Sequence, residues 1–250
     1  MEKKTCKKCQ GTGWMLKEKE GRTTAQRCIC FKDSKKNQLF LRSNIPKRYE
    51  SCTLENFEIH KDNVSHKDAL KISWQFIKNY PVQDIGLLFI GPCGVGKTHL
   101  AVSILNELIR KKEAFCYFCD FRELIRKIQS TYSPESSMTE FQLLQPVFNS
   151  DVLVLDELGA KRTTAWVEDT VFYIINSRYN QKKLTLFTSN YLDSEGDEED
   201  TRDSFFKKKD DNLIDRIGIR LRSRIYEMCK IVEMWGEDYR QVIKQANYRF

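Results

Sequence analysis

The chain has 250 residues and a net charge of +7, and its 40% hydrophobic and 31% charged residues are typical of a soluble globular protein. No apolar run approaches the roughly 20 residues that a membrane span needs, and the N-terminal MEKKTCKKCQ lacks the apolar core of a secretory signal. Both observations argue against a membrane protein and predict a cytoplasmic one.

The positive charge is concentrated at the N-terminus. Residues 1–50 contain 14 Lys or Arg against 5 Asp or Glu, whereas the other 200 residues contain 28 against 30. A basic segment fits contact with nucleic acid or with an acidic protein surface, although nonspecific attraction explains it equally well.

The same segment contains two close cysteine pairs with the spacing of a zinc site, in the pattern C-x-x-C followed by C-x-C. They are Cys6, Cys9, Cys28 and Cys30. Four thiolates can hold one tetrahedral Zn²⁺, and a bound ion explains how some thirty residues without an apolar core fold. The alternative is four unligated thiols in a disordered tail, and the C-x-C pair departs from the commoner C-x-x-C knuckle.

Residues 66–80, HKDALKISWQFIKNY, have apolar side chains at helical spacing and predict an amphipathic helix. Beyond them, short apolar runs alternate with longer helical runs. The runs predict strands at 86–91, 114–119, 151–156 and 184–189, and helices at 97–112, 121–131 and 166–179. This alternation predicts an α/β fold in which a central parallel sheet has helices on both faces. The charge-dense residues 193–211 predict an exposed loop.

Residues 91–98, GPCGVGKT, form a complete phosphate-binding loop motif between a predicted strand and a predicted helix. Backbone N–H groups and the helix N-terminus would bind the phosphates of ATP. Lys97 would bridge the β- and γ-phosphates, and Thr98 would bind Mg²⁺. The predicted nucleotide-binding residues are Gly91, Pro92, Cys93, Gly94, Val95, Gly96, Lys97, Thr98 and His99. A chance match in a glycine turn is the alternative.

Two acids follow the predicted buried strand at 151–156. Asp156 would hold Mg²⁺ and Glu157 would deprotonate the attacking water, because ligands of such sheets lie at the carboxyl ends of the strands. A solvated turn is the alternative. The next strand ends in TSN, so Asn190 could hold the water or sense the γ-phosphate. His60, His66 and His99 show neither ligand nor triad spacing.

The order GPCGVGKT, LVLDELG, FTSN and RIGIRLRSRI resembles the AAA+ ATPases. More narrowly, IPKRYESCTLENF, WVEDTVFYIINSRYN, SRIYEMC and GEDYR resemble the DnaC/DnaI/IstB group of bacterial helicase loaders and transposition helpers. The resemblance covers about residues 45–240. It implies a three-layer AAA+ domain at 81–250 without a full C-terminal lid. A zinc-binding module would occupy 1–35, and a linker with N-terminal helices 36–80.

The resemblance also implies residues that act between subunits. Arg224 matches the arginine finger that completes a neighbouring subunit's site through self-association, with Arg220 as the alternate and Arg240 as a weaker nucleotide sensor. The N-terminal module would dock on a replicative DNA helicase. Single-stranded DNA would contact the segment that follows the second strand. Its candidate residues are Arg122, Arg126, Lys127 and Tyr132, although a solvated helix face explains them equally well.

The function predicted first is an ATP-dependent helicase loader that hydrolyses ATP with Mg²⁺ and carries zinc. An IstB-type transposition helper shares the same core. A metabolic P-loop kinase would work as a monomer and need no arginine finger, and an adaptor would use ATP only to switch shape.

Overall fold

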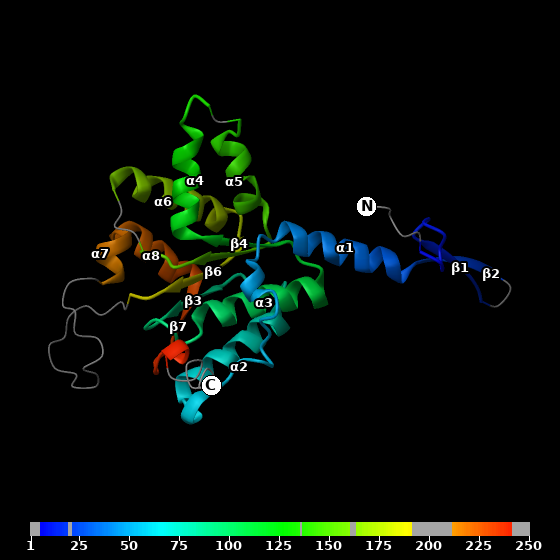
Figure 1. Ribbon diagram of the computed structural model, residues 1–250, viewed down its shortest axis with the longest axis horizontal. Coiled ribbons are helices and arrows are strands. Elements are labelled where there is room, and N and C mark those ends of the chain that lie inside the picture. The colour runs from blue at the N-terminus through cyan, green and yellow to red at the C-terminus, as the bar shows by residue number, and fades with distance from the viewer. Residues whose placement is uncertain (1–5, 20–21, 136, 161–163, 192–211, 242–250) are drawn as a thin grey trace, which may run out of the picture.

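The computed structural model describes residues 6–19, 22–135, 137–160, 164–191 and 212–241. At the N-terminal end, β1 (Trp14–Lys19) and β2 (Arg22–Arg27) form an antiparallel hairpin. Helix α1 (Ile29–Arg42) follows and runs between this hairpin and the main body of the protein, where it contacts α3 (Figure 1). The sequence did not predict the hairpin or α1, and the boundary expected at residue 35 falls inside this helix.

The main body is built on a five-stranded parallel sheet with the order β4-β5-β6-β3-β7. Its strands are β3 (Gly86–Ile90), β4 (Cys116–Asp120), β5 (Val152–Asp156), β6 (Leu184–Ser189) and β7 (Cys229–Glu233). The four predicted strands are confirmed, with ends shifted by at most two residues. The fifth strand, β7, was not predicted, and it extends the sheet on the far side of β3.

Alternate side chains of the buried strands enter two separate cores, as the period of two in a strand requires. In β3, Leu87 and Phe89 pack into one core, and Leu88 and Ile90 pack into the other. Helices α2 (Val64–Asn79) and α3 (Lys97–Lys112) cover the first face. The second face is covered by α4 (Phe121–Thr131), α5 (Glu140–Asn149), α6 (Ala165–Asn180), α7 (Leu213–Ile217) and α8 (Ile219–Met228) (Figure 1). The expected three-layer arrangement is therefore confirmed.

The helices predicted at 97–112 and 121–131 match α3 and α4, and the one at 166–179 matches α6 within one residue at each end. Helix α5 was not predicted. The loop expected at 193–211 lies outside the described residues. Within the part of the chain that is described, no helix combines the length and apolar character needed to cross a membrane.

Candidate functional site

The phosphate-loop residues form the turn between β3 and α3, at the carboxyl edge of the sheet. Gly96 lies immediately before α3 with a left-handed φ of 96°. A Cβ atom at this position would come within 2.5 Å of the Phe57 ring, so the turn requires glycine. The first N–H groups of α3 therefore face the loop, where a phosphate group would benefit from them.

Lys97 is buried, with 6% of its surface exposed. Its ammonium group donates hydrogen bonds to the carbonyl oxygens of Gly91 at 2.7 Å and Pro92 at 2.5 Å. Burial lowers the pKa of Lys97 to about 8. Both acceptors are neutral carbonyls, and Lys97 forms no ion pair with a carboxylate among the described residues, so a phosphate oxygen entering the loop would meet an unpaired cation.

Asp156 at the end of β5 lies beside Thr98 at the start of α3. Its Oδ1 accepts hydrogen bonds from Thr98 Oγ1 at 2.8 Å and Thr188 Oγ1 at 2.6 Å. Burial raises the pKa of this carboxyl group, although the two hydroxyl donors oppose the shift. A buried carboxylate with only hydroxyl partners favours a cation, and a carboxylate paired with a hydroxyl is an oxygen ligand set that suits Mg²⁺. The residues therefore fit the predicted magnesium site.

Glu157 follows Asp156 with a left-handed φ of 57°, a conformation uncommon for a residue other than glycine. Its backbone N–H donates to Thr188 Oγ1 at 2.9 Å, and its carboxylate forms an ion pair with Arg122 at the start of α4. Glu157, Thr188 and Asn190 line one cavity together with the phosphate loop. The acidic and polar strand ends are thus brought together, as expected from the order of the motifs.

This cavity has a volume of about 330 Å³, within the range of small-molecule sites. Besides the phosphate loop and the strand ends, two further segments form its walls. Residues before β3 contribute Tyr49, Phe57 and His66, and the segment after β7 contributes Tyr239 and Arg240. Arg240, predicted as a nucleotide sensor, therefore lies at the cavity.

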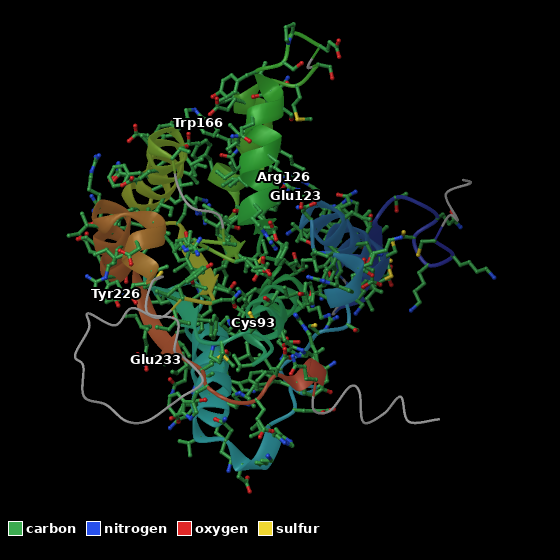
Figure 2. The ribbon with its side chains drawn as sticks, turned by 60° about the vertical axis from the view of Figure 1, so that its left-hand side comes forward. Cys93, Glu123, Arg126, Trp166, Tyr226 and Glu233 are labelled. Carbon is green, nitrogen blue, oxygen red and sulfur yellow. The ribbon has the colours of Figure 1, made fainter. Side chains whose placement is uncertain are left out.

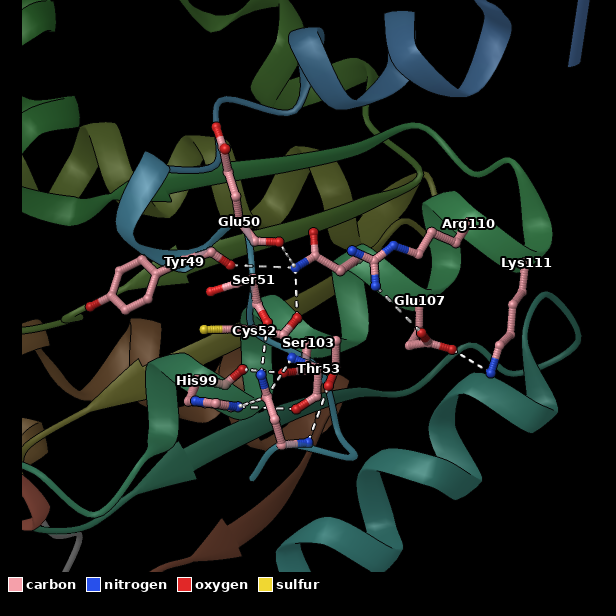
Figure 3. A network of polar contacts seen from close by, with 12 residues as sticks. Tyr49, Glu50, Ser51, Cys52, Thr53, His99, Ser103, Glu107, Arg110 and Lys111 are labelled. Carbon is pink, nitrogen blue, oxygen red and sulfur yellow. Dashed lines mark hydrogen bonds and ion pairs between the residues drawn. The ribbon is translucent and has the colours of Figure 1, made fainter. Parts of the chain in front are cut away.

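His99 also lines the cavity, and its ring connects α3 to the segment around Thr53 and Asn56. Its Nε2 lies 3.0 Å from both the Thr53 carbonyl oxygen and Asn56 Oδ1. About two turns further along α3, Asn106 Nδ2 donates to the Cys52 carbonyl oxygen at 2.8 Å (Figure 3). These contacts fix residues 49–57, and with them the Phe57 ring, against the phosphate loop.

Arg220 and Arg224 lie outside this cavity, on α8. The Arg224 guanidinium stacks 4.1 Å over the Tyr179 ring and forms an ion pair with Glu227 at 2.9 Å. Arg220 stacks 4.6 Å over the Phe172 ring. A finger acts on the site of a neighbouring subunit, so its position away from this chain's own cavity agrees with the predicted role without testing it.

The four N-terminal cysteines lie together. All four sulfur atoms are within 4.8 Å of one another, and tetrahedral zinc with bonds of about 2.3 Å places its sulfurs about 3.8 Å apart. The Gly13 N–H donates to Cys9 Sγ at 3.3 Å. Backbone hydrogen bonds from Cys9 and Lys8 lower the pKa of Cys6 to about 6, whereas hydrogen bonds with Cys9 and Cys28 raise the pKa of Cys30. The donor set fits Zn²⁺.

Removing zinc is expected to unfold the hairpin. The module has little apolar burial, and the Arg27 guanidinium lies 3.8 Å from the Trp14 ring, which is 44% exposed. Purified protein should contain about one zinc per chain by elemental analysis, and a chelator should abolish the near-ultraviolet signal of Trp14. Cys9→Ser should lose the metal, whereas Cys93→Ser, at an exposed cysteine outside the cluster, should keep it. Retention of zinc by Cys9→Ser would contradict this assignment.

Sequence reasoning missed the cavity wall formed by Phe57, His60, His66, Glu237 and Tyr239. These residues come from two segments about 170 residues apart. Phe57, Glu237 and Tyr239 lie in blocks that carry the family resemblance, but no chemical role was assigned to any of the five. The pairing of Asn63 Nδ2 with the Trp235 carbonyl oxygen at 2.6 Å joins the two segments. No local signal in the sequence indicates that contact.

Comparison with known proteins places this geometry in a family. The family model described as IstB-like ATP binding protein matches residues 30–247. The chain is 29% identical over 180 residues to a protein of Buchnera aphidicola subsp. Baizongia pistaciae named replicative helicase loader DnaC, covering 72% of each chain. It is 26% identical to phage-like element PBSX protein XkdC of Bacillus subtilis strain 168, over 97% of this chain and 84% of that one.

Among solved structures, the crystal structure of the DnaC helicase loader matches with a TM-score of 0.62 and 36% identity, over 76% of this chain and all of that one. The structure of DnaI matches with a TM-score of 0.57 and 22% identity, which supports the fold alone. The match to the family extends from α1 through the phosphate loop, the strand ends and α8. The chain therefore belongs to the IstB-like ATP-binding protein family and has the AAA+ fold of DnaC.

Proposed function

We propose that this protein is an ATP-dependent loader of a replicative DNA helicase. The observation that carries the proposal is the cavity in which the phosphate loop and Glu157 meet, with Asp156 hydrogen-bonded to the Thr98 hydroxyl that lines it, in a chain similar to proteins named replicative helicase loaders. The cavity supplies the chemistry of a nucleoside triphosphatase. The similarity to proteins named replicative helicase loaders supports a replicative helicase as the partner and DNA replication as the process.

The residues have distinct tasks in hydrolysis. Lys97 exchanges its carbonyl partners for phosphate oxygens and stabilises their negative charge. Thr98 and Asp156 would hold Mg²⁺, which would supply positive charge to neutralise the phosphate oxygens. Glu157 accepts a proton from the attacking water, and Asn190 orients that water from the end of β6. Glu157 must leave its ion pair with Arg122 to act.

Arg224 is proposed to complete the site of a neighbouring subunit. It projects from α8 as a half-buried side chain, 27% exposed, and is held by Tyr179 and Glu227. A guanidinium group inserted beside the γ-phosphate stabilises charge that develops during transfer. Self-association would then couple hydrolysis to assembly.

Contact with single-stranded DNA is proposed for α4, with fewer available cations than the sequence suggested. Arg122 is engaged by Glu157, and Lys127 forms an ion pair with Glu123 at 2.6 Å. Arg126 is exposed, on α4 above Cys93 in Figure 2. Tyr132 is 60% exposed and its hydroxyl donates to Glu140. Arg126 and Tyr132 are therefore the residues of this segment best placed for DNA.

The proposed function is tested by capture with the cognate replicative helicase. Immobilised helicase should retain the full-length protein, and ATP should change the retained amount. Removal of zinc should abolish retention, because the N-terminal module is proposed to dock on the helicase. Equal and negligible retention with and without ATP would contradict a loading role.

A second function is favoured by the family match itself, whose description is IstB-like ATP binding protein. A transposition helper would use the same ATP site on a transposase. The same capture experiment separates the two functions: retention by a transposase encoded beside the gene, and not by the helicase, would support the transposition helper.

A further inference from the structure

The guanidinium group of Arg224 is one of three side-chain groups that all contact one another. It stacks 4.1 Å over the Tyr179 ring, and its Nη1 donates to Glu227 Oε2 at 2.9 Å. The Tyr179 hydroxyl donates a hydrogen bond to the other oxygen of the same carboxylate, Glu227 Oε1. Each oxygen of Glu227 therefore holds one of the other two side chains, and the three residues form a closed group, the Arg224 cluster.

The backbone on both sides of the Arg224 cluster is fixed by buried neighbours. In α6, Tyr179 follows Arg178, whose guanidinium is fully buried and donates hydrogen bonds to three main-chain carbonyl oxygens. In α8, Arg224 precedes Ile225, which is fully buried in the second core. Packing thus sets the positions of both helices, and the cluster restrains the remaining freedom, which is that of the Arg224 side chain.

Arg220, the alternate candidate for the finger, is held less completely. Its guanidinium stacks 4.6 Å over the Phe172 ring, and phenylalanine has no hydroxyl group with which to fix a carboxylate beside it. Within the described part of the chain, only Arg224 of these two arginines combines a stacked ring with an ion pair. The two candidates therefore differ in how firmly their side chains are ordered.

An arginine that acts on the nucleotide of another subunit gains from being ordered in advance. Its long side chain loses rotamer freedom when it is fixed, which costs free energy, and correct orientation of a catalytic group lowers the activation barrier. Glu227 bonds to one nitrogen of Arg224 and the Tyr179 ring covers one face, whereas a guanidinium group has five N–H donors. Donors therefore remain for the oxygens of a phosphoryl group.

From these contacts we infer that Tyr179 and Glu227 are positioning residues, which hold Arg224 in the geometry that it needs at the γ-phosphate bound by a neighbouring subunit. Neither residue lines the ATP cavity of its own chain, so both act through Arg224. The inference deepens the proposed function and rests on it, because it requires Arg224 to act on a second copy of the chain.

The inference is tested first with Tyr179→Leu, which removes the ring under the guanidinium and the hydroxyl beside Glu227. The kcat of ATP hydrolysis should fall by about tenfold or more, while ATP affinity measured by calorimetry stays at the wild-type value. Glu227→Ala should lower kcat in the same way, and Tyr179→Phe, which keeps the ring, should recover most of the activity. Tyr173→Leu, the same change at a 62% exposed tyrosine of α6, should hydrolyse ATP as wild type does.

Mixing two variants shows whether the Arg224 cluster acts on a neighbouring subunit. Lys97→Ala has an impaired ATP site but an intact cluster, and Tyr179→Leu has the reverse. Adding Lys97→Ala to Tyr179→Leu should raise hydrolysis above that of Tyr179→Leu alone, because the added subunits supply an ordered Arg224. The double variant carrying both Lys97→Ala and Tyr179→Leu should give no such rescue. A tyrosine that only supports its own chain would not be rescued by either.

The outcomes separate this inference from the proposed function. Wild-type kcat in Tyr179→Leu, or the absence of rescue by Lys97→Ala, would overturn the positioning role. Loss of ATP affinity together with kcat would overturn it too, because the cluster would then support the fold rather than the finger. Wild-type hydrolysis by Arg224→Ala would instead overturn the proposed finger, and wild-type protein without ATP hydrolysis would overturn the proposed function.

Discussion

Glu157→Gln is expected to lower the rate of ATP hydrolysis by about 100-fold or more while leaving ATP affinity near the wild-type value. The amide is close in shape to the carboxylate but cannot accept a proton from water. The phosphate loop, Lys97 and Asp156 are unchanged, so the nucleotide should still bind. Steady-state phosphate release and equilibrium nucleotide binding measure the two quantities separately.

The matched control is Glu233→Gln, the same chemical change at an exposed glutamate that ends β7 and does not line the cavity. Hydrolysis by this variant should stay at the wild-type rate. If Glu157→Gln hydrolysed ATP as fast as wild type, another residue would have to activate the water. If Glu157→Gln lost ATP binding as well, the Glu157 carboxylate would have a structural role in the site. Its ion pair with Arg122 would account for such a role.

Arg178→Met is expected to reduce the free energy of unfolding by about 3 kcal/mol. Arg178 in α6 is fully buried. Its guanidinium donates to the carbonyl oxygens of Val147 at 2.6 Å, Ser150 at 3.0 Å and Leu184 at 2.6 Å, and also to Thr185 Oγ1 at 3.0 Å. These bonds tie the end of α5 to the start of β6. Removing the donor leaves several buried acceptors unpaired, at about 1–3 kcal/mol each, and the relief of the buried charge offsets part of that cost.

Burial lowers the pKa of Arg178 to about 9, so the side chain remains charged at neutral pH. The free-energy cost of burying this charge opposes the stabilisation from its hydrogen bonds. Denaturant unfolding of zinc-loaded protein measures the net effect on the free energy of unfolding. Arg126→Met, the same change at an exposed position of α4, should alter stability by less than about 0.5 kcal/mol. An Arg178→Met protein as stable as wild type would show that desolvation outweighs the hydrogen bonds.

The parts of the fold that the sequence predicted are those with strong local signals. Strands β3, β5 and β6 are short runs in which every residue is buried and most are apolar, so they stand out in the sequence as strand candidates. Strand β7 has exposed Lys230 and Glu233 because it lies at the edge of the sheet, and it follows α8 without a turn. Its sequence, CKIVE, therefore carried no recognisable strand signal.

Two helices were missed for different physical reasons. Helix α5 contains Pro146, which usually ends a helix, although here a capping box at Thr139 and Gln142 stabilises its first turn. Helix α1 is mostly polar and exposed, because it lies apart from the main core over much of its length and packs only in part against α3 (Figure 1). Without a wide apolar stripe it resembled a linker.

The candidate site also has one part that the sequence predicts and one part that it does not. Its phosphate half consists of motifs contiguous in sequence, so Lys97, Asp156 and Glu157 could be named from spacing alone. The half around His66 depends on a contact between α2 and the chain after β7, which only the folded sheet creates. That wall of the cavity was therefore out of reach from the sequence.

The turn between β3 and α3 is proposed to bind a triphosphate through Lys97. The most direct test of this binding is the ATP affinity of Lys97→Ala in magnesium buffer, compared with Lys112→Ala, an exposed lysine at the end of the same helix. Loss of a buried charge that pairs with phosphate should weaken binding by at least about 30-fold, whereas Lys112→Ala should bind as wild type does. Unchanged affinity in Lys97→Ala would contradict the account.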